Sequence, residues 1–217
     1  MIRPLKAILF DFDGTLTKLN IDFLQMRRAV LDLMCDYCSP QDDMEDLYVL
    51  EMIEAGKNLI SRNNSGREKD FFNRAHELIS RMETEGAKKG ELFAGMEDML
   101  YELRSRHIKT GIVTRNCMAA VKQLFPDIAS HCDTVITREL TARVKPYPEH
   151  LLAALDALDT DAKFSAMVGD HPMDITVGKD VGAYTIGVLT GYSGVASLRE
   201  AGADLIIESA ADITRLL

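Results

Sequence analysis

The chain has 217 residues, of which 47% are hydrophobic and 27% charged, and this is the composition of an ordinary globular protein. The length suffices for one domain, or for a domain with a smaller insert. The formal net charge of −9 argues against nucleic acid as the main partner, because phosphate backbones require a basic surface. A small anionic substrate stays compatible, since an acidic protein can hold a local basic pocket.

Membrane and secretion signals are missing from the pattern. No apolar segment approaches the roughly 18–20 residues that span a membrane, and the first apolar run breaks at Asp11 instead of forming a secretory signal. We therefore expect a cytoplasmic protein without a membrane partner. A Cys35-x-x-Cys38 pair is present, but no second pair or nearby histidine completes a zinc site. We expect reduced thiols that pack as small apolar groups.

The first predicted strand ends in two acids. The stretch Ala7–Thr17 begins with apolar strand formers and continues into Asp11 and Asp13, which are followed by Gly14. Side chains two residues apart on a strand share a face, so we expect both carboxylates to point the same way, with Cα atoms about 6–7 Å apart. Like charges at this separation repel unless a cation or a shared proton intervenes. The pattern therefore predicts a functional site at the end of this strand.

A helical region follows. No convincing strand is found from about Leu19 to Glu91, whereas apolar stripes of helical spacing run from Phe23 to Tyr37 and from Phe71 to Met82. A third helix is expected over Asp42–Leu59, and Asn63–Gly66 is a turn signal after it. The interpretation is a small α-helical cap domain, residues 19–91, inserted after strand 1. Residues 1–18 and 92–217 would then form the catalytic core.

Short apolar runs recur beyond the insert and alternate with segments of helical periodicity. This alternation predicts an α/β fold, a Rossmann-like parallel sheet with helices on both faces. In such sheets ligands bind at the carboxyl ends of the strands. The expected strands are Ile108–Thr114, Thr134–Thr137, Ser165–Gly169, Ala183–Leu189 and Asp204–Ile207.

Four polar groups follow the predicted strands in chain order. They are Asp11 with Asp13, Thr114-Arg115-Asn116, Lys145, and Asp170-His171 with Asp174. If the sheet is parallel, all four converge at one edge. Mg²⁺ prefers carboxylate and carbonyl oxygens and bridges to substrate phosphate, while a lysine and a hydroxyl can hold phosphoryl oxygens. The set is therefore typical of a site for a divalent cation and a phosphoryl group.

These segments resemble, in order and spacing, the four motifs of the haloacid dehalogenase superfamily. The helical insert is similar in position to the small mobile cap of the subgroup that contains phosphoglycolate phosphatase. The matching positions are Asp11–Thr15, Thr114, Lys145, and Gly169-Asp170 with Asp174.

The resemblance implies a role for each matching residue. Asp11 would attack phosphorus and form an aspartyl-phosphate, and Asp13 would be the general acid and base. Thr114 and Lys145 would stabilise the transferring group. The resemblance also implies Mg²⁺ as cofactor. Its ligands would be the carboxylates of Asp11 and Asp170 and the backbone carbonyl of Asp13, with Asp174 as a further ligand or acting through water.

Several polar residues keep two interpretations. Arg115 and Asn116 either orient substrate oxygens or cap the next helix, and His171 either contacts substrate or simply lines the cleft. Arg62, Asn63, Asn64 and Arg67 of the insert either close over an anionic substrate or form a solvated loop. The remaining histidines show no ligand spacing and are interpreted as structural or surface residues: His76, His107, His131 and His150.

The predicted function is a Mg²⁺-dependent phosphatase that hydrolyses a small phosphate monoester, a phosphorylated metabolite, as phosphoglycolate phosphatase does. The alternative is a phosphomutase similar to β-phosphoglucomutase, which returns the phosphate to a sugar and shares the four motifs. A third hypothesis is a non-catalytic phospho-switch or partner-binding protein, against which the insert and Asp13 argue. The sequence does not distinguish a monomer from a homodimer.

Overall fold

The protein consists of two compact units. The computed structural model describes residues 4–18, 20–62 and 66–217. The core unit comprises Met1–Leu19 and Gly90–Leu217, and the helical unit comprises Asn20–Lys89. Of the predicted turn at 63–66, only Gly66 lies among the described residues.

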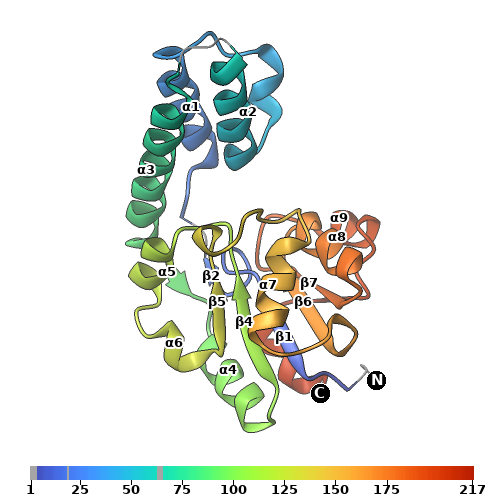
Figure 1. The fold of residues 1–217 in the computed structure, drawn as a ribbon. Coiled ribbons are helices and arrows are strands. Elements are labelled where there is room, and N and C mark those ends of the chain that lie inside the picture. The colour runs from blue at the N-terminus through green and yellow to red at the C-terminus, as the bar shows by residue number, and fades with distance from the viewer. Residues whose placement is uncertain (1–3, 19, 63–65) are drawn as a thin grey trace. The chain divides into compact units, whose positions relative to one another are not determined.

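A parallel sheet forms the centre of the core unit (Figure 1). The strand order is β5-β4-β1-β6-β7-β8 and every neighbouring pair is parallel, so β1 lies inside the sheet between β4 and β6. The strands are β1 (Ala7–Phe10), β4 (Lys109–Val113), β5 (Thr134–Ile136), β6 (Ser165–Gly169), β7 (Tyr184–Val188) and β8 (Leu205–Ile207).

Helices cover both faces of this sheet, because both faces of its strands are apolar. Ile8 and Phe10 of β1 pack with α4, α5, α6 and η4, whereas Ala7 and Leu9 pack with α7 and α8. This arrangement confirms the predicted fold class. The helices are α4 (Met96–Ser105), α5 (Met118–Leu124), α6 (Ile128–His131), α7 (Glu149–Ala157), α8 (Pro172–Val181), α9 (Val195–Glu200), and the 3₁₀ segments η2 (Arg138–Leu140), η3 (Ala162–Phe164) and η4 (Ala210–Arg215).

Three helices around one apolar core form the helical unit. They are α1 (Phe23–Cys35), α2 (Val49–Arg62) and α3 (Glu68–Ala87), preceded in the case of α2 by η1 (Asp42–Asp46). The close approach of these helices depends on Gly56, where an added Cβ would lie 2.5 Å from Met34 and 2.9 Å from Phe71. The helix expected over 42–59 begins later than predicted, at Val49, because Leu47 is extended and ends the 3₁₀ segment.

A two-stranded antiparallel ribbon was not predicted. In it β2 (Thr17–Lys18) pairs with β3 (Glu91–Leu92) within the core unit. Strands of two residues are too short to show an alternating pattern. The expectation of no strand up to Glu91 is thus wrong by one residue.

The cysteines are all free thiols. Cys117 and Cys132 are buried, as expected for small apolar groups. Cys38 is half-buried, and Cys35 is exposed because it lies on the solvent side of the last turn of α1. The packing prediction is therefore wrong for Cys35.

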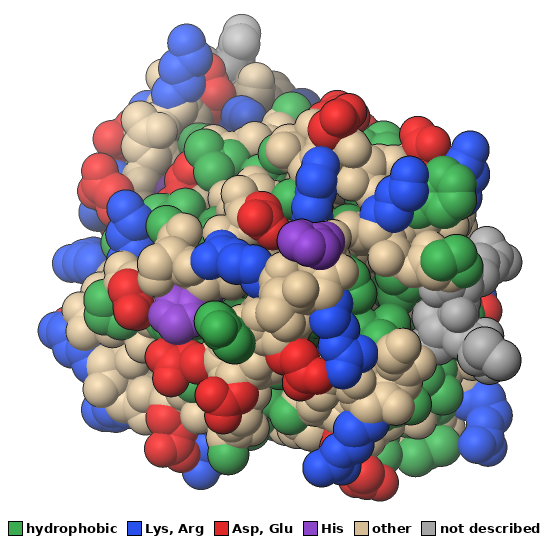
Figure 2. Space-filling view, turned by 90° about the horizontal axis from the view of Figure 1, so that it is seen from below, with side chains coloured by type: hydrophobic (Ala, Val, Ile, Leu, Met, Phe, Trp, Pro, Cys, Tyr) green, Lys and Arg blue, Asp and Glu red, His purple; other side chains and the backbone are tan. Residues whose placement is uncertain are grey.

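The surface carries charges of both signs. Figure 2 shows acidic and basic side chains interspersed over one face, with apolar side chains between them and neither charge dominating that view. Among the described residues, no helix combines the length and the apolar character that crossing a membrane requires.

The central strand should dominate the stability of the core unit. Leu9 is fully buried between β4 and α7, so Leu9→Ala is expected to lower the free energy of unfolding by about 2–5 kcal/mol. Leu152 of α7 is 44% exposed, and Leu152→Ala should change it by about 0.5 kcal/mol or less. Urea unfolding measures both, and an equal cost in the two variants would contradict this packing.

Candidate active site

The sheet brings the predicted motifs to one edge. Phe10 of β1 is in register with Ile112 of β4 and with Val168 of β6. Because these strands are parallel, the residues that follow them emerge at the same edge. The backbone N–H of Asp11 continues the ladder by donating to the Val168 carbonyl at 2.9 Å. The fold thus places Asp11 close to residues more than 150 positions later in the chain.

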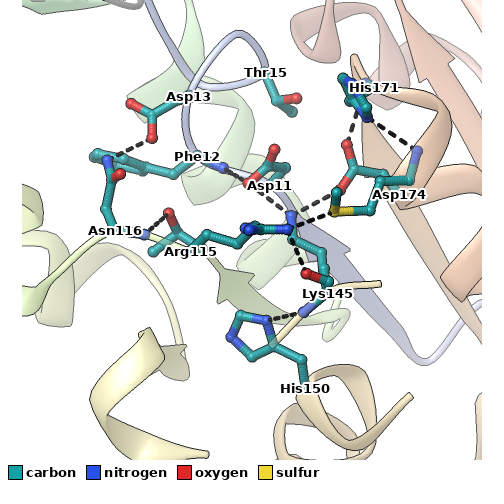
Figure 3. Close-up of polar contacts among 12 residues, drawn as sticks. Asp11, Phe12, Asp13, Thr15, Arg115, Asn116, Lys145, His150, His171 and Asp174 are labelled. Atoms are coloured by element: carbon teal, nitrogen blue, oxygen red, sulfur yellow. Dashed lines mark hydrogen bonds and ion pairs between the residues drawn. The ribbon is translucent and has the colours of Figure 1, made fainter. Parts of the chain in front are cut away.

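Lys145 joins two of the acids. Its Nζ lies 2.8 Å from Oδ1 of Asp11 and 2.7 Å from Oδ1 of Asp174, and the residue is 1% exposed (Figure 3). Burial opposes the charge, but the attraction of Asp11 and then of Asp174 raises the pKa of Lys145 above its usual value. The side chain is therefore a buried ammonium.

Three carboxylates form a cluster, and two of them contact this ammonium. One oxygen each from Asp11, Asp170 and Asp174 lies within 4.8 Å of the others. Burial raises the pKa of Asp11 well above its usual value, Lys145 opposes this, and the other two acids add to it. Burial and then Asp174 raise the pKa of Asp170 to about 6. One ammonium facing three carboxylates leaves excess negative charge, which suits a divalent cation such as Mg²⁺.

The carboxylate of Asp170 is held in a narrow space. Thr15 Oγ1 donates to its Oδ1 at 3.3 Å, and the backbone N–H of Tyr192 donates to its Oδ2 at 3.3 Å. An added Cβ would lie 2.5 Å from Oδ2 at Gly14, and 1.8 Å at Gly191. Only glycine allows the backbone this close to the acid. Sequence reasoning placed Thr15 in the first motif without giving it a role. It missed Gly191 and Tyr192, although the strand-end rule applied to β7 indicates the loop at 189–192.

Asp13 lies apart from the acidic cluster. Strand β1 ends at Phe10, so the alternation that was expected to align Asp13 with Asp11 does not extend this far. Figure 3 shows the Asp13 carboxylate beside Asn116, whose Nδ2 donates to it, and Thr17 Oγ1 lies 3.5 Å from its other oxygen. The backbone carbonyl of Asp13 stays a predicted metal ligand.

The motif after β4 makes contacts within the protein. Thr114 is buried, and its Oγ1 accepts the backbone N–H of Asn116 at 3.1 Å. Arg115 donates from Nη1 to the Lys145 carbonyl at 2.7 Å and lies 3.3 Å from the sulfur of Met173. These bonds place Arg115 beside the site, and its substrate contact stays a prediction, as do those of Thr114 and Asn116.

His171 caps the N-terminus of helix α8. Its Nδ1 accepts the backbone N–H of Met173 at 3.1 Å, while Asp174 Oδ2 accepts the His171 N–H at 3.2 Å. Burial lowers the pKa of His171, which keeps the ring neutral and able to accept. This reciprocal cap fixes Asp174 against the cluster. Substrate contact by His171 stays a prediction.

Comparison with known proteins identifies the family. The family model described as haloacid dehalogenase-like hydrolase matches residues 8–188. The chain belongs to this family. The match spans all four predicted motifs, so the haloacid dehalogenase-like hydrolase resemblance noted from the sequence is confirmed.

Two of the similar proteins are named as a pyrophosphatase and as a phosphatase. The chain is 30% identical to pyrophosphatase PpaX of Bacillus velezensis over 220 residues, covering 99% of this chain and 97% of that one. It is 28% identical to the N-acetylmuramic acid 6-phosphate phosphatase of Pseudomonas putida, with 87% and 84% covered.

A solved structure shares the fold across the whole chain. A crystal structure described as a predicted phosphoglycolate phosphatase of Haemophilus somnus aligns with a TM-score of 0.66 at 17% identity, covering 100% of this chain and 99% of that one. At this identity the likeness concerns the fold.

The pKa of Asp170 predicts how the metal-free haloacid dehalogenase-like hydrolase responds to pH. Between pH 3.8 and about pH 6, the Asp170 carboxyl keeps a proton in the folded protein that it has released in the unfolded chain. The stability that this proton contributes to the folded state is complete below pH 3.8 and is lost as the pH rises through about 6. Asn cannot ionise at this position. In urea unfolding with EDTA, the free energy of unfolding of Asp170→Asn should therefore exceed that of the wild type by more at about pH 7.5 than at about pH 5. An unchanged difference would contradict the raised pKa.

Mg²⁺ should bind at this cluster. At about pH 7.5, saturating Mg²⁺ is expected to raise the wild-type Tm, because a ligand that binds only the folded state stabilises it. Asp170→Asn should lose most of this response, whereas Asp156→Asn, an exposed acid on α7, should keep it. Thermal melts with and without Mg²⁺ measure the effect. Equal responses in all three proteins would contradict the assigned site.

Proposed function

We propose that this hydrolase is a Mg²⁺-dependent phosphatase that cleaves small phosphate monoesters through an aspartyl-phosphate on Asp11. The supporting observation is the buried Lys145 ammonium, which lies between Asp11 and Asp174 at 2.8 and 2.7 Å. A cation beside a carboxylate nucleophile reduces the repulsion between that nucleophile and an incoming phosphate dianion.

The acidic cluster is proposed to hold the metal. Asp11, Asp170 and the backbone carbonyl of Asp13 would be ligands, with Asp174 as a further ligand or acting through water. When bound, Mg²⁺ neutralises charge on the phosphoryl group and favours ionised carboxylates. The fit rests on the excess of acids over ammonium and on the raised pKa of Asp170.

The chain's own residues are assigned the bond-making steps. Asp11 attacks phosphorus, so that a carboxylate oxygen–phosphorus bond forms while the ester oxygen–phosphorus bond breaks. Asp13 gives its proton to the leaving oxygen, and it later takes a proton from the water that hydrolyses the aspartyl-phosphate and releases phosphate. Thr114 and Lys145 hold phosphoryl oxygens throughout. Asn116 supports this scheme by keeping the Asp13 carboxylate in place.

The helical unit is proposed to act as a cap domain, because it lies in the chain between motifs one and two. In this interpretation the cap excludes bulk water during phosphoryl transfer and its polar residues select the ester. Arg115, Asn116 and His171 would contribute from the core unit. The substrate class is set by this selection rather than by the shared acids.

Asp11→Asn should abolish turnover. Loss of the nucleophile is expected to lower kcat by at least about 10³-fold, because Asn cannot form the acyl-phosphate. Folding should be kept, since the change removes one of three mutually repelling acids. Phosphate release with Mg²⁺ over a panel of phosphoglycolate, sugar phosphates, nucleotides and pyrophosphate measures this. Asp156→Asn is the matched control, and full activity of Asp11→Asn would disprove the assigned nucleophile.

The same panel tests the phosphomutase alternative. A hexose 1-phosphate that yields hexose 6-phosphate without free phosphate would show transfer to sugar instead of water. Labelled aspartyl-phosphate that persists without hydrolysis of any ester would instead favour the phospho-switch.

A further inference from the structure

The loop that carries Lys145 has no regular secondary structure. Residues 141–148 connect η2 to α7, so neither backbone polar group of Lys145 belongs to a helix or a sheet ladder. Both are bound by side chains instead. His150 Nδ1 accepts the Lys145 N–H at 3.1 Å, and Arg115 donates to the Lys145 carbonyl at 2.7 Å. Because buried backbone groups need such partners, these two side chains hold the backbone of Lys145 in place.

His150 also links this loop to the sheet. It stands in the first turn of α7, is fully buried, and its Nε2 lies 3.2 Å from the carbonyl of Ile136 at the end of β5. Since the Lys145 N–H can only donate, Nδ1 must be the accepting nitrogen. The proton therefore lies on Nε2, which donates to Ile136. The neutral ring thus joins the loop to the end of β5, and Figure 3 shows its hydrogen bond to the Lys145 backbone.

The surroundings keep this ring uncharged. Burial, then the positive charges of Lys145 and Arg115, lower the pKa of His150 to about 3, although the Ile136 carbonyl opposes the shift. A protonated ring would lose its acceptor and place a second cation beside the ammonium. The two hydrogen bonds and the fixed tautomer therefore support each other.

We propose that His150 is a positioning residue, which through its Nδ1 holds the Lys145 backbone so that Nζ lies between Asp11 and Asp174. It does not touch the reacting atoms and acts only through Lys145. Its catalytic consequence rests on the proposed function, whereas its structural consequence, the place of the Lys145 ammonium, does not.

Two variants separate the two hydrogen bonds of His150. The Oδ1 of His150→Asn can take the place of Nδ1 and accept from Lys145, while the Nε2 of His150→Gln can take the place of the ring Nε2 and donate to Ile136. Each variant removes one buried hydrogen bond, so both should lose similar stability in urea. A purely structural role would then lower the activity of both alike.

We expect the two variants to differ in kcat. His150→Gln should lose kcat by about 10- to 100-fold, with KM changed by less than about 3-fold, because Lys145 shifts relative to the phosphoryl group. His150→Asn should keep kcat within about 3-fold of wild type. Equal losses, no loss, or the reverse order would overturn the proposal.

Crystal structures of the variants give a readout without activity. Lys145 Nζ should stay within hydrogen-bond reach of Asp11 and Asp174 in His150→Asn and leave at least one of them in His150→Gln; an unmoved Nζ in both overturns the proposal. If the wild type cleaves no phosphate ester, the proposed function fails. The crystal structures of the two variants then still test whether His150 positions Lys145. If His150→Gln does not fold, nitrogen NMR of the wild-type protein tests the proposal instead. A His150 ring that carries a proton on Nδ1 near neutral pH cannot accept the Lys145 N–H and overturns the proposal.

Discussion

A single buried ammonium facing three carboxylates is the constraint on which this site depends. Lys145 cannot be buried alone, since an unpaired charge in the interior costs several kcal/mol, and Asp11 and Asp174 each lie within 2.8 Å of it. The acids in turn exceed what one lysine can neutralise. The pKa of Asp170 therefore rises to about 6, and the cluster is left with an affinity for a proton or a cation. This excess of acids over the one ammonium destabilises the fully ionised cluster and makes it suited to a divalent cation.

The surrounding structure holds this cluster through short-range restraints. Gly14 and Gly191 bring backbone against Asp170, where a methyl group would not fit. His171 and Asp174 cap the start of α8 reciprocally, so the helix end that forms also fixes the acid. Lys145 lies in a loop and not in a helix or a strand, and its backbone is held by side chains of neighbouring segments. Precision at the site thus comes from both regular and irregular structure.

The family membership and the site agree on the kind of chemistry but leave the substrate to other residues. Relatives named as a pyrophosphatase and as an N-acetylmuramic acid 6-phosphate phosphatase align over most of this chain. Asp11 and Lys145 face only the phosphoryl group in the proposed scheme. Hydrolysis and transfer to a sugar differ in which molecule next reaches the aspartyl-phosphate. That choice is proposed to belong to the helical unit.

The sequence by itself determined the sheet, the insert and the identity of the acids, because apolar runs and strand-end motifs are local patterns. It did not determine where Asp13 points, since that depends on β1 ending at Phe10. It gave no signal for His150, whose two hydrogen bonds join segments that only the fold brings together. The convergence of Asp170 and Lys145 on Asp11 was likewise conditional on parallel pairing. Tertiary structure decided these points, because hydrogen-bond partners and burial are properties of neighbours in space and not of neighbours in the chain.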